Sequence, residues 1–145
     1  MADLTERALV VETDPDRRDI ETLQDRLYAF NVERTGFADG ELLAIFVRGD
    51  AGEVRAGLYG WTWAGVLEVR YLWVDENLRG QGVGSRLLQT AEVTARERGC
   101  HLAVLDTDSF QAPAFYERRG YEVYARLDAY PPGHQKLFLR KRLTD

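Results

Sequence analysis

The sequence predicts a single α/β domain built on a mixed sheet, with helices between its strands. Two observations predict this class. Three strand-like runs follow one another through short turns, which is typical of an antiparallel meander. A strand-like run, a helical run and another strand-like run then follow, which indicates a parallel neighbour reached by a crossover. The length of 145 residues is usual for one domain.

Composition is that of an ordinary globular protein, with 45% hydrophobic and 30% charged residues. The formal net charge of −5 argues against a general nucleic-acid surface. A single cysteine, Cys100, excludes an internal disulfide and fits a reducing compartment. Two histidines and no clustered ligands argue against a metal site. Residues 1–16 hold no apolar leader and no run is long enough to span a membrane, so we expect a cytoplasmic protein with neither membrane nor nucleic-acid partners.

The first expected elements are a strand and a helix. Arg7–Glu12 contains Ala-Leu-Val-Val, an apolar run that suits a strand. The segment 14–16 (Asp-Pro-Asp) supplies a cap candidate, a proline and acidic charge, which indicate a helix start. A loop is expected over residues 36–40. Apolar residues at helical spacing extend the helix to about Val32, namely Ile20, Leu23, Leu27 and Phe30.

Three strands and the turns between them come next. Apolar and β-branched residues predict strands over Leu42–Val47, Val54–Trp63 and Val66–Val74. Glycine-containing turns separate them at residues 49–52 and 64–65. Turns this short favour antiparallel neighbours.

Helices and strands alternate in the second half of the chain. Ser85–Arg98 has an apolar face, a basic last turn and a glycine stop at Gly99, which indicates a helix. The remaining expected elements are a short strand at Leu102–Leu105, a short helix at Ala112–Arg119 ended by Gly120, and two last strands at Tyr121–Leu127 and Gln135–Leu143.

The segment Arg79–Gly84 (Arg-Gly-Gln-Gly-Val-Gly) lies between an apolar strand and a long helix. Its alternate glycines remove β-carbons that would block approach to the backbone. The helix start beside them presents unpaired N–H groups and the positive end of the helix dipole. The segment therefore predicts a seat for a phosphorylated ligand, with a plain tight turn as the alternative. Its spacing matches neither the P-loop of nucleotide hydrolases nor the dinucleotide fingerprint.

Arg79, Gly82 and Gly84 resemble the Arg-x-x-Gly-x-Gly pyrophosphate motif of the GNAT superfamily of acyl-CoA N-acyltransferases. Residues 72–75 (Leu-Trp-Val-Asp) are similar to the end of the fourth strand of that family. Residues 112–121 resemble its later motif, with Tyr116 four residues before a glycine. The resemblance spans about residues 40–143. It implies a GNAT-like mixed, mostly antiparallel sheet with flanking helices, in which a central parallel strand pair splays around the coenzyme A cleft.

The resemblance implies acetyl-CoA as the acyl-donor substrate, with no metal. Its pyrophosphate would accept from N–H groups of the glycine segment, and its peptide-like arm would pair with strand backbone at Leu72 and Val74. The Val74 N–H would also hold the thioester carbonyl. Ser109 stands where relatives often carry an asparagine that contacts this arm, and it either keeps that contact or caps the short helix. The expected donor-site residues are Leu72, Trp73, Val74, Arg79, Gly80, Gln81, Gly82, Val83, Gly84, Ser85 and Ser109.

The resemblance also implies direct attack of an amine on the thioester, with much of the rate coming from positioning. Tyr116 is the expected hydrogen-bond donor to the departing thiolate, and the alternative is a core aromatic on a short helix. Glu68 is the candidate base, because strand alternation places it on the face of Leu72 and Val74. Arg70 stands where a family glutamate is often found, so a water chain is the alternative to a base on this strand.

The expected activity is N-acetylation of a primary amine on a small molecule or a peptide. An acyl-CoA-binding sensor without turnover is the alternative function. Many members of this family are dimers, so a homodimer is one possible oligomeric state of this protein. Aromatic and carboxylate side chains in the acceptor regions suit an amine with an apolar body. The alternative for Trp61 and Trp63, which are two residues apart, is that they simply cover one face of the sheet. The alternative for His134 is that it is a loop residue that makes a backbone contact. The acceptor-site candidates are Tyr28, Trp63, Tyr130 and His134.

Overall fold

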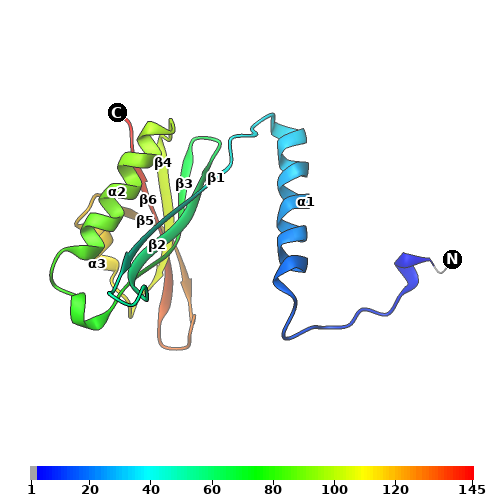
Figure 1. Cartoon of the computed structure of the whole chain (residues 1–145), viewed down its shortest axis with the longest axis horizontal. Helices are drawn as coiled ribbons and strands as arrows, with labels where there is room; N and C mark the ends of the chain where they lie inside the picture. Colours follow the sequence, from blue (N-terminus) through cyan, green and yellow to red (C-terminus); the bar gives the residue numbers. More distant parts are fainter. Residues whose placement is uncertain (1–2) are drawn as a thin grey trace. The chain divides into compact units, whose positions relative to one another are not determined.

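The computed structural model describes residues 3–145 and divides the chain into two compact units (Figure 1). The first unit ends at Phe37 and the second spans Ala38–Asp145. Among the described residues, no helix combines the length and the apolar character needed to cross a lipid bilayer. The single-domain organisation of the chain stays a prediction.

The first unit carries a short 3-10 helix, η1 (Leu4–Glu6), and one long helix, α1 (Arg17–Thr35). The predicted helix start is confirmed, because the side chain of Asp16 accepts a hydrogen bond from the backbone N–H of Arg18. Gly36, in the left-handed conformation, ends the helix. The predicted strand over Arg7–Glu12 is wrong: this segment is exposed coil. A strand needs a neighbour for its backbone groups, and no described strand pairs with these residues.

The described strands of the second unit form one sheet of six, in the order β1-β2-β3-β4-β6-β5. This mixed, mostly antiparallel sheet confirms the predicted fold class. The meander over residues 41–74 is antiparallel, and β3 and β4 run parallel. The elements are β1 (Glu41–Arg48), β2 (Val54–Trp63), β3 (Val66–Val74), η2 (Glu76–Leu78), α2 (Val83–Glu97), β4 (Leu102–Asp108), α3 (Pro113–Glu117), β5 (Glu122–Asp128) and β6 (Gln135–Arg142).

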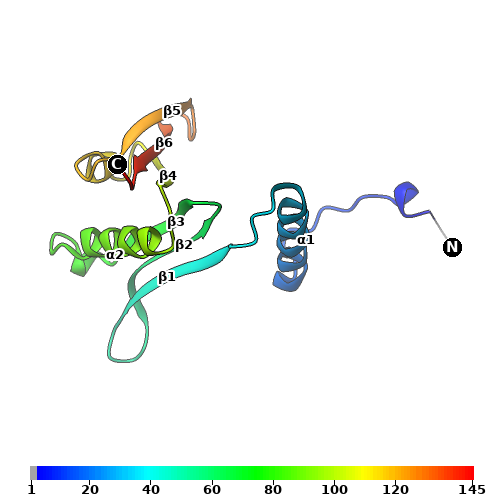
Figure 2. The same ribbon diagram turned by 90° about the horizontal axis from the view of Figure 1, so that it is seen from above.

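Helix α2 covers one face of the first three strands, as Figure 2 shows. Its apolar face is buried against them through Leu87, Leu88, Ala91 and Ala95. In β2, buried residues alternate with more exposed ones, which is the expected pattern for a sheet with one covered face. The largest fully buried side chains include Leu58, Leu67, Leu88 and Leu139, so the core reaches from α2 across the sheet.

Candidate active site

The two parallel strands separate partway along their length. Pairing between β3 and β4 covers four residue pairs, from Val66 with Leu102 to Val69 with Leu105. Beyond that point β3 continues to Val74 and β4 to Asp108 without pairing to each other. The structure therefore contains the splayed parallel pair that the sequence predicted, and backbone groups of both strands face the gap.

The register of β2 and β3 sets which backbone groups of β3 face this gap. The Asp75 N–H donates to the Arg55 carbonyl at 2.8 Å, so the next pair, Ala56 with Val74, is a non-hydrogen-bonded pair. The same alternation applies to Leu72. The N–H and C=O groups of Leu72 and Val74 consequently point away from β2, toward the side on which β4 lies.

A β-bulge at Arg70 reverses the alternation of β3. Tyr59 pairs with Tyr71 while Gly60 pairs with Val69, which leaves Arg70 as the extra residue. Before the bulge Leu67 and Val69 are buried in the core, so Glu68 projects from the opposite face.

After the bulge, Leu72 and Val74 are the residues that pack against the core. The parity argument that placed Glu68 on the face of Leu72 and Val74 is therefore wrong. A strict period of two fails wherever a strand carries an extra residue.

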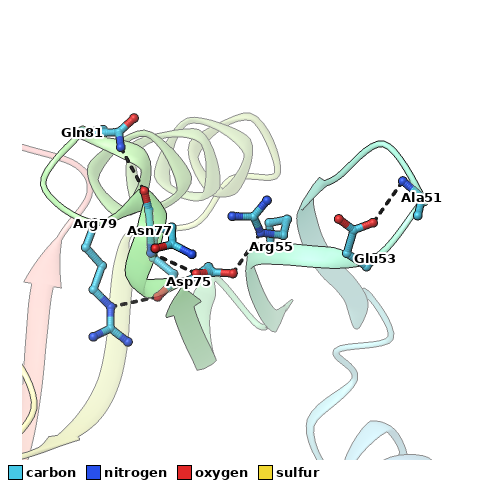
Figure 3. A network of polar contacts seen from close by, with 8 residues as sticks. Ala51, Glu53, Arg55, Asp75, Asn77, Arg79 and Gln81 are labelled. Atoms are coloured by element: carbon cyan, nitrogen blue, oxygen red, sulfur yellow. Dashed lines mark hydrogen bonds and ion pairs between the residues drawn. The ribbon is translucent and has the colours of Figure 1, made fainter.

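A polar network holds the turn between β3 and the glycine segment (Figure 3). Asp75 accepts from the Asn77 backbone N–H and from Arg55 Nε, both at 2.9 Å. These hydrogen bonds, the one from Asn77 first, hold the pKa of the Asp75 carboxyl below its ordinary value. Arg79 Nε donates to the Val74 carbonyl at 3.0 Å, which ties the start of the glycine segment to the end of β3.

The glycine segment enters α2 through two left-handed residues. Gly80 and Gly82 have φ of +76° and +81°, a region that glycine adopts without strain. A β-carbon on either would have no described atom within 4 Å, so both face open space. Gly82 is the N-cap of α2 and makes no side-chain cap bond among the described residues. The first N–H groups of the helix have no helical partners, because its first intrahelical bond runs from the Arg86 N–H to the Gly82 carbonyl.

Tyr116 lies on α3 and is 9% exposed. Its ring packs edge-on against Phe115 and Tyr121. Burial, with a smaller contribution from the charge of Asp106, raises the pKa of Tyr116 to about 12. Within residues 3–145 its hydroxyl makes no hydrogen bond. The side chain is therefore a core aromatic whose phenol is neutral at ordinary pH, and its role as hydrogen-bond donor to the thiolate stays a prediction.

The two serines of the predicted donor site both accept hydrogen bonds through their hydroxyl oxygens. The hydroxyl oxygen of Ser85 accepts from Arg119 Nε at 3.0 Å. That of Ser109 accepts from the Gln135 backbone N–H at 2.9 Å. The capping alternative for Ser109 is wrong, because Ala112 is the N-cap of α3 and receives no side-chain bond. Ser109 instead ties the end of β4 to the start of β6.

The face opposite α2 carries carboxylates that sequence reasoning missed. Strand β4 runs three residues past its predicted end, to Asp108, and Asp106 alternates there with the buried residues Leu105 and Thr107. The signal was the continued period of two after Leu105. Lys136 Nζ lies 3.5 Å from Asp106 Oδ1 and 3.7 Å from Asp108 Oδ1. Asp108 Oδ1 is buried and has no hydrogen-bond donor among the described residues.

The predicted acceptor residues occupy different places. Tyr130 lies under Lys136 Nζ, 4.6 Å from its ring centroid. His134 donates its backbone N–H to the Pro131 carbonyl and packs its ring against Phe110, and its part in acceptor binding stays a prediction. Trp63 pairs with Val66, at the end of β3 remote from the splay. Tyr28 lies on α1 in the first unit and stays a prediction.

Trp61 is better placed than Trp63, because it lies directly opposite Glu68. Both tryptophans project from the face away from α2, as residues two apart on a strand must. The residues predicted to bind the donor, the glycine segment and Tyr116, are thus distinct from a second group, Trp61, Glu68 and Asp106, on the sheet face away from α2.

Comparisons with known proteins agree with this geometry. A family model for the acetyltransferase (GNAT) domain matches residues 38–123. The chain is 45% identical over 107 residues to blasticidin-S acetyltransferase of Streptomyces morookaense, covering 71% of this chain and 76% of that protein. It is 40% identical over 120 residues to acetyltransferase Atu2258 of Agrobacterium fabrum, covering 83% and 88%.

Among solved structures, an acetyltransferase from Agrobacterium tumefaciens superposes with a TM-score of 0.82 at 37% identity, over 94% of this chain and 99% of that one. The matched family region contains the splayed strands, the glycine segment and Tyr116. The chain belongs to the GNAT acetyltransferase family and is an acyl-CoA-dependent acetyltransferase.

Proposed function

We propose that this enzyme transfers the acetyl group of acetyl-CoA to a primary amine of a small molecule, by direct attack within a ternary complex. The observation that carries the proposal is the gap between β3 and β4, which leaves backbone groups of β3 without a strand partner. Such a gap brings two reactants together, and positioning alone supplies much of the rate in a reaction without a protein nucleophile.

The donor binds along β3 and the start of α2. The open space at Gly80 and Gly82 and the unpaired N–H groups of α2 suit the pyrophosphate. Because Arg79 Nε is bonded to the Val74 carbonyl, only its other guanidinium nitrogens remain for the phosphate. The pantetheine arm pairs with the outward backbone of Leu72, and the Val74 N–H polarises the thioester carbonyl.

Tyr116 stabilises the leaving thiolate by hydrogen bonding. A thiol titrates near 8.5, so full proton transfer from a phenol of pKa about 12 is uphill by roughly 5 kcal/mol. A hydrogen bond that strengthens as charge develops on sulfur avoids that cost. Solvent then supplies the proton.

The attacking amine lies on the face of Trp61, Glu68 and Asp106. Glu68 stands opposite Val104 in the parallel register, and Asp106 follows two residues later on the same face of β4. The two carboxylates thus flank the point where the strands diverge. They attract the ammonium form of the acceptor, and one of them takes its proton, directly or through water.

The acceptor class follows from this chemistry and from the relatives. Carboxylates beside Trp61 suit a cationic amine on an apolar or aromatic body. The relative named for acetylation of blasticidin S, at 45% identity, supports a small-molecule amine.

The test is release of free thiol from acetyl-CoA with a panel of amines that includes blasticidin S, polyamines and a lysine peptide. We expect turnover with at least one small-molecule amine and none with the peptide. Glu68→Gln and Asp106→Asn, made separately, should each lower kcat/KM for the amine and leave acetyl-CoA affinity unchanged. Binding of acetyl-CoA with no turnover on any amine would instead support a sensor.

A further inference from the structure

Helix α3 places Tyr116 but has little to hold it in position by itself. It has five residues, and its N-cap, Ala112, makes no side-chain hydrogen bond among the described residues. A helix this short is unstable in isolation, so its placement comes from tertiary contacts.

Arg119, two residues after α3, makes contacts that can supply this placement. Its Nε donates to Ser85 Oγ at 3.0 Å, and its Nη1 donates to the Phe115 carbonyl at 2.7 Å. Its guanidinium carbon lies 3.8 Å from the centroid of the Phe115 ring. One side chain therefore grips the first turn of α2 and the backbone of α3 together. We call Arg119, Ser85 and Phe115 the Arg119 latch.

The Phe115 ring extends the latch to the glycine segment. A β-carbon on Gly84 would lie 3.5 Å from Phe115 Cζ and 3.6 Å from Val74 Cγ2, so these side chains converge on Gly84. The latch consequently meets the end of β3 and the start of α2, the elements to which the proposed function assigns the pantetheine arm and the pyrophosphate. Tyr116 is the immediate neighbour of Phe115 on α3.

We infer that Arg119 is a positioning residue, which fixes the Tyr116 hydroxyl relative to the phosphate seat through the Arg119 latch. This inference rests on the proposed function. Lysine cannot replace it fully, because an ammonium lacks the planar fork that bonds two oxygens while stacking on a ring. Arg118 is a matched control, because it is the adjacent arginine and its side chain is exposed.

The first experiment needs no substrate. Hydrogen exchange follows the amides of Arg118, Arg119, Gly120 and Tyr121, which donate to carbonyls of residues 114–117. We expect Arg119→Met to speed their exchange about tenfold or more relative to the wild type and to Arg118→Met, by loosening α3 locally. Exchange equal to that of the control would overturn the latch, whether or not acetyl-CoA binds.

The second experiment measures kcat at saturating acetyl-CoA in a double-mutant cycle. Arg119→Met should lower kcat about tenfold in the wild type and less than about twofold in the Tyr116→Phe background, because it acts through Tyr116. Arg119→Lys should recover part of the loss. An equal fold-loss in both backgrounds would show a merely structural role and overturn the inference. Failure of the wild type to bind acetyl-CoA would overturn the proposed function instead.

Discussion

Gly82 and Gly84 stand two residues apart but have different requirements. Gly82 has φ of +81° and faces open space, whereas Gly84 has an ordinary helical backbone and touches Phe115 and Val74. A side chain at Gly82 therefore strains the backbone and projects toward the proposed phosphate seat. A methyl group at Gly84 meets its neighbours at ordinary contact distance.

Two substitutions separate strain from obstruction at Gly82. Gly82→Ala should lower the free energy of unfolding by about 1–2 kcal/mol, because a β-carbon disfavours the left-handed region. Gly82→Asn should cost less, since asparagine visits that region more readily. Both should weaken acetyl-CoA binding in calorimetry at least tenfold, an order-of-magnitude figure for a lost charged contact. Wild-type affinity in a folded Gly82→Asn variant would contradict the phosphate seat.

Tyr116→Phe tests the thiolate hydrogen bond. A hydrogen bond to a charged group contributes about 1.5–3 kcal/mol, so kcat should fall about 10- to 100-fold. Because the phenol has a pKa of about 12, it stays protonated below that pH and adds no break to the rate profile between pH 6 and 9. Acetyl-CoA affinity should not change. A break in the wild-type profile that vanishes in Tyr116→Phe would contradict a permanently neutral donor.

The bulge in β3 depends on a glycine in the neighbouring strand. A β-carbon on Gly60 would collide with the carbonyl oxygen of Glu68 and would lie 3.1 Å from Val69 Cα. Only glycine allows β2 and β3 to approach this closely. Because the bulge turns Glu68 to one face of the sheet and Leu72 to the other, Gly60 sets which side chains of β3 pack against the core and which project from the opposite face.

Gly60→Ala should accordingly destabilise the fold. The obstacle is backbone rather than a flexible side chain, so we expect a loss of about 2–3 kcal/mol in chemical denaturation. Gly84→Ala is the matched control and should be neutral or slightly stabilising, because alanine is the better helix former. A Gly60→Ala variant as stable as this control would show that the strands can separate without cost.

At the level of elements, the sequence pattern correctly predicted those strands whose ends and faces are set by nearby residues. The strands Val54–Trp63 and Val66–Val74 were confirmed with their bounds, because turns and alternation specify them. Long-range pairing explains the errors. Arg7–Glu12 has a strand-like composition but no described partner, and Glu68 changed face because of an extra residue at Arg70. Asp106 was missed because its strand runs on through polar residues.

In the second unit as a whole, the sheet consists of two halves joined by a short seam. Strands β1–β3 form one half and β4–β6 the other, and the four residue pairs of β3 and β4 join them. Helix α2 packs on the first half, yet its side chains also reach the second. Arg96 Nε donates to the Leu143 carbonyl at 2.8 Å, and Glu92 accepts from Lys141 Nζ at 2.6 Å. These contacts add to the four β3–β4 residue pairs that join the two halves of the sheet.

Glu92 makes several of the contacts between α2 and the second half of the sheet, and replacing it tests whether these contacts stabilise the fold. It is 5% exposed and also accepts from the Tyr121 hydroxyl at 3.0 Å. Glu92→Leu leaves the Lys141 ammonium, 22% exposed, and the Tyr121 hydroxyl without their acceptor. We expect a loss of about 3 kcal/mol in urea unfolding, and Glu92→Leu with Lys141→Met should recover part of it, because breaking a buried pair costs more than replacing both partners. A double variant no more stable than Glu92→Leu alone would mean that the stranded lysine is not the cause, and that α2 holds the two halves by packing instead.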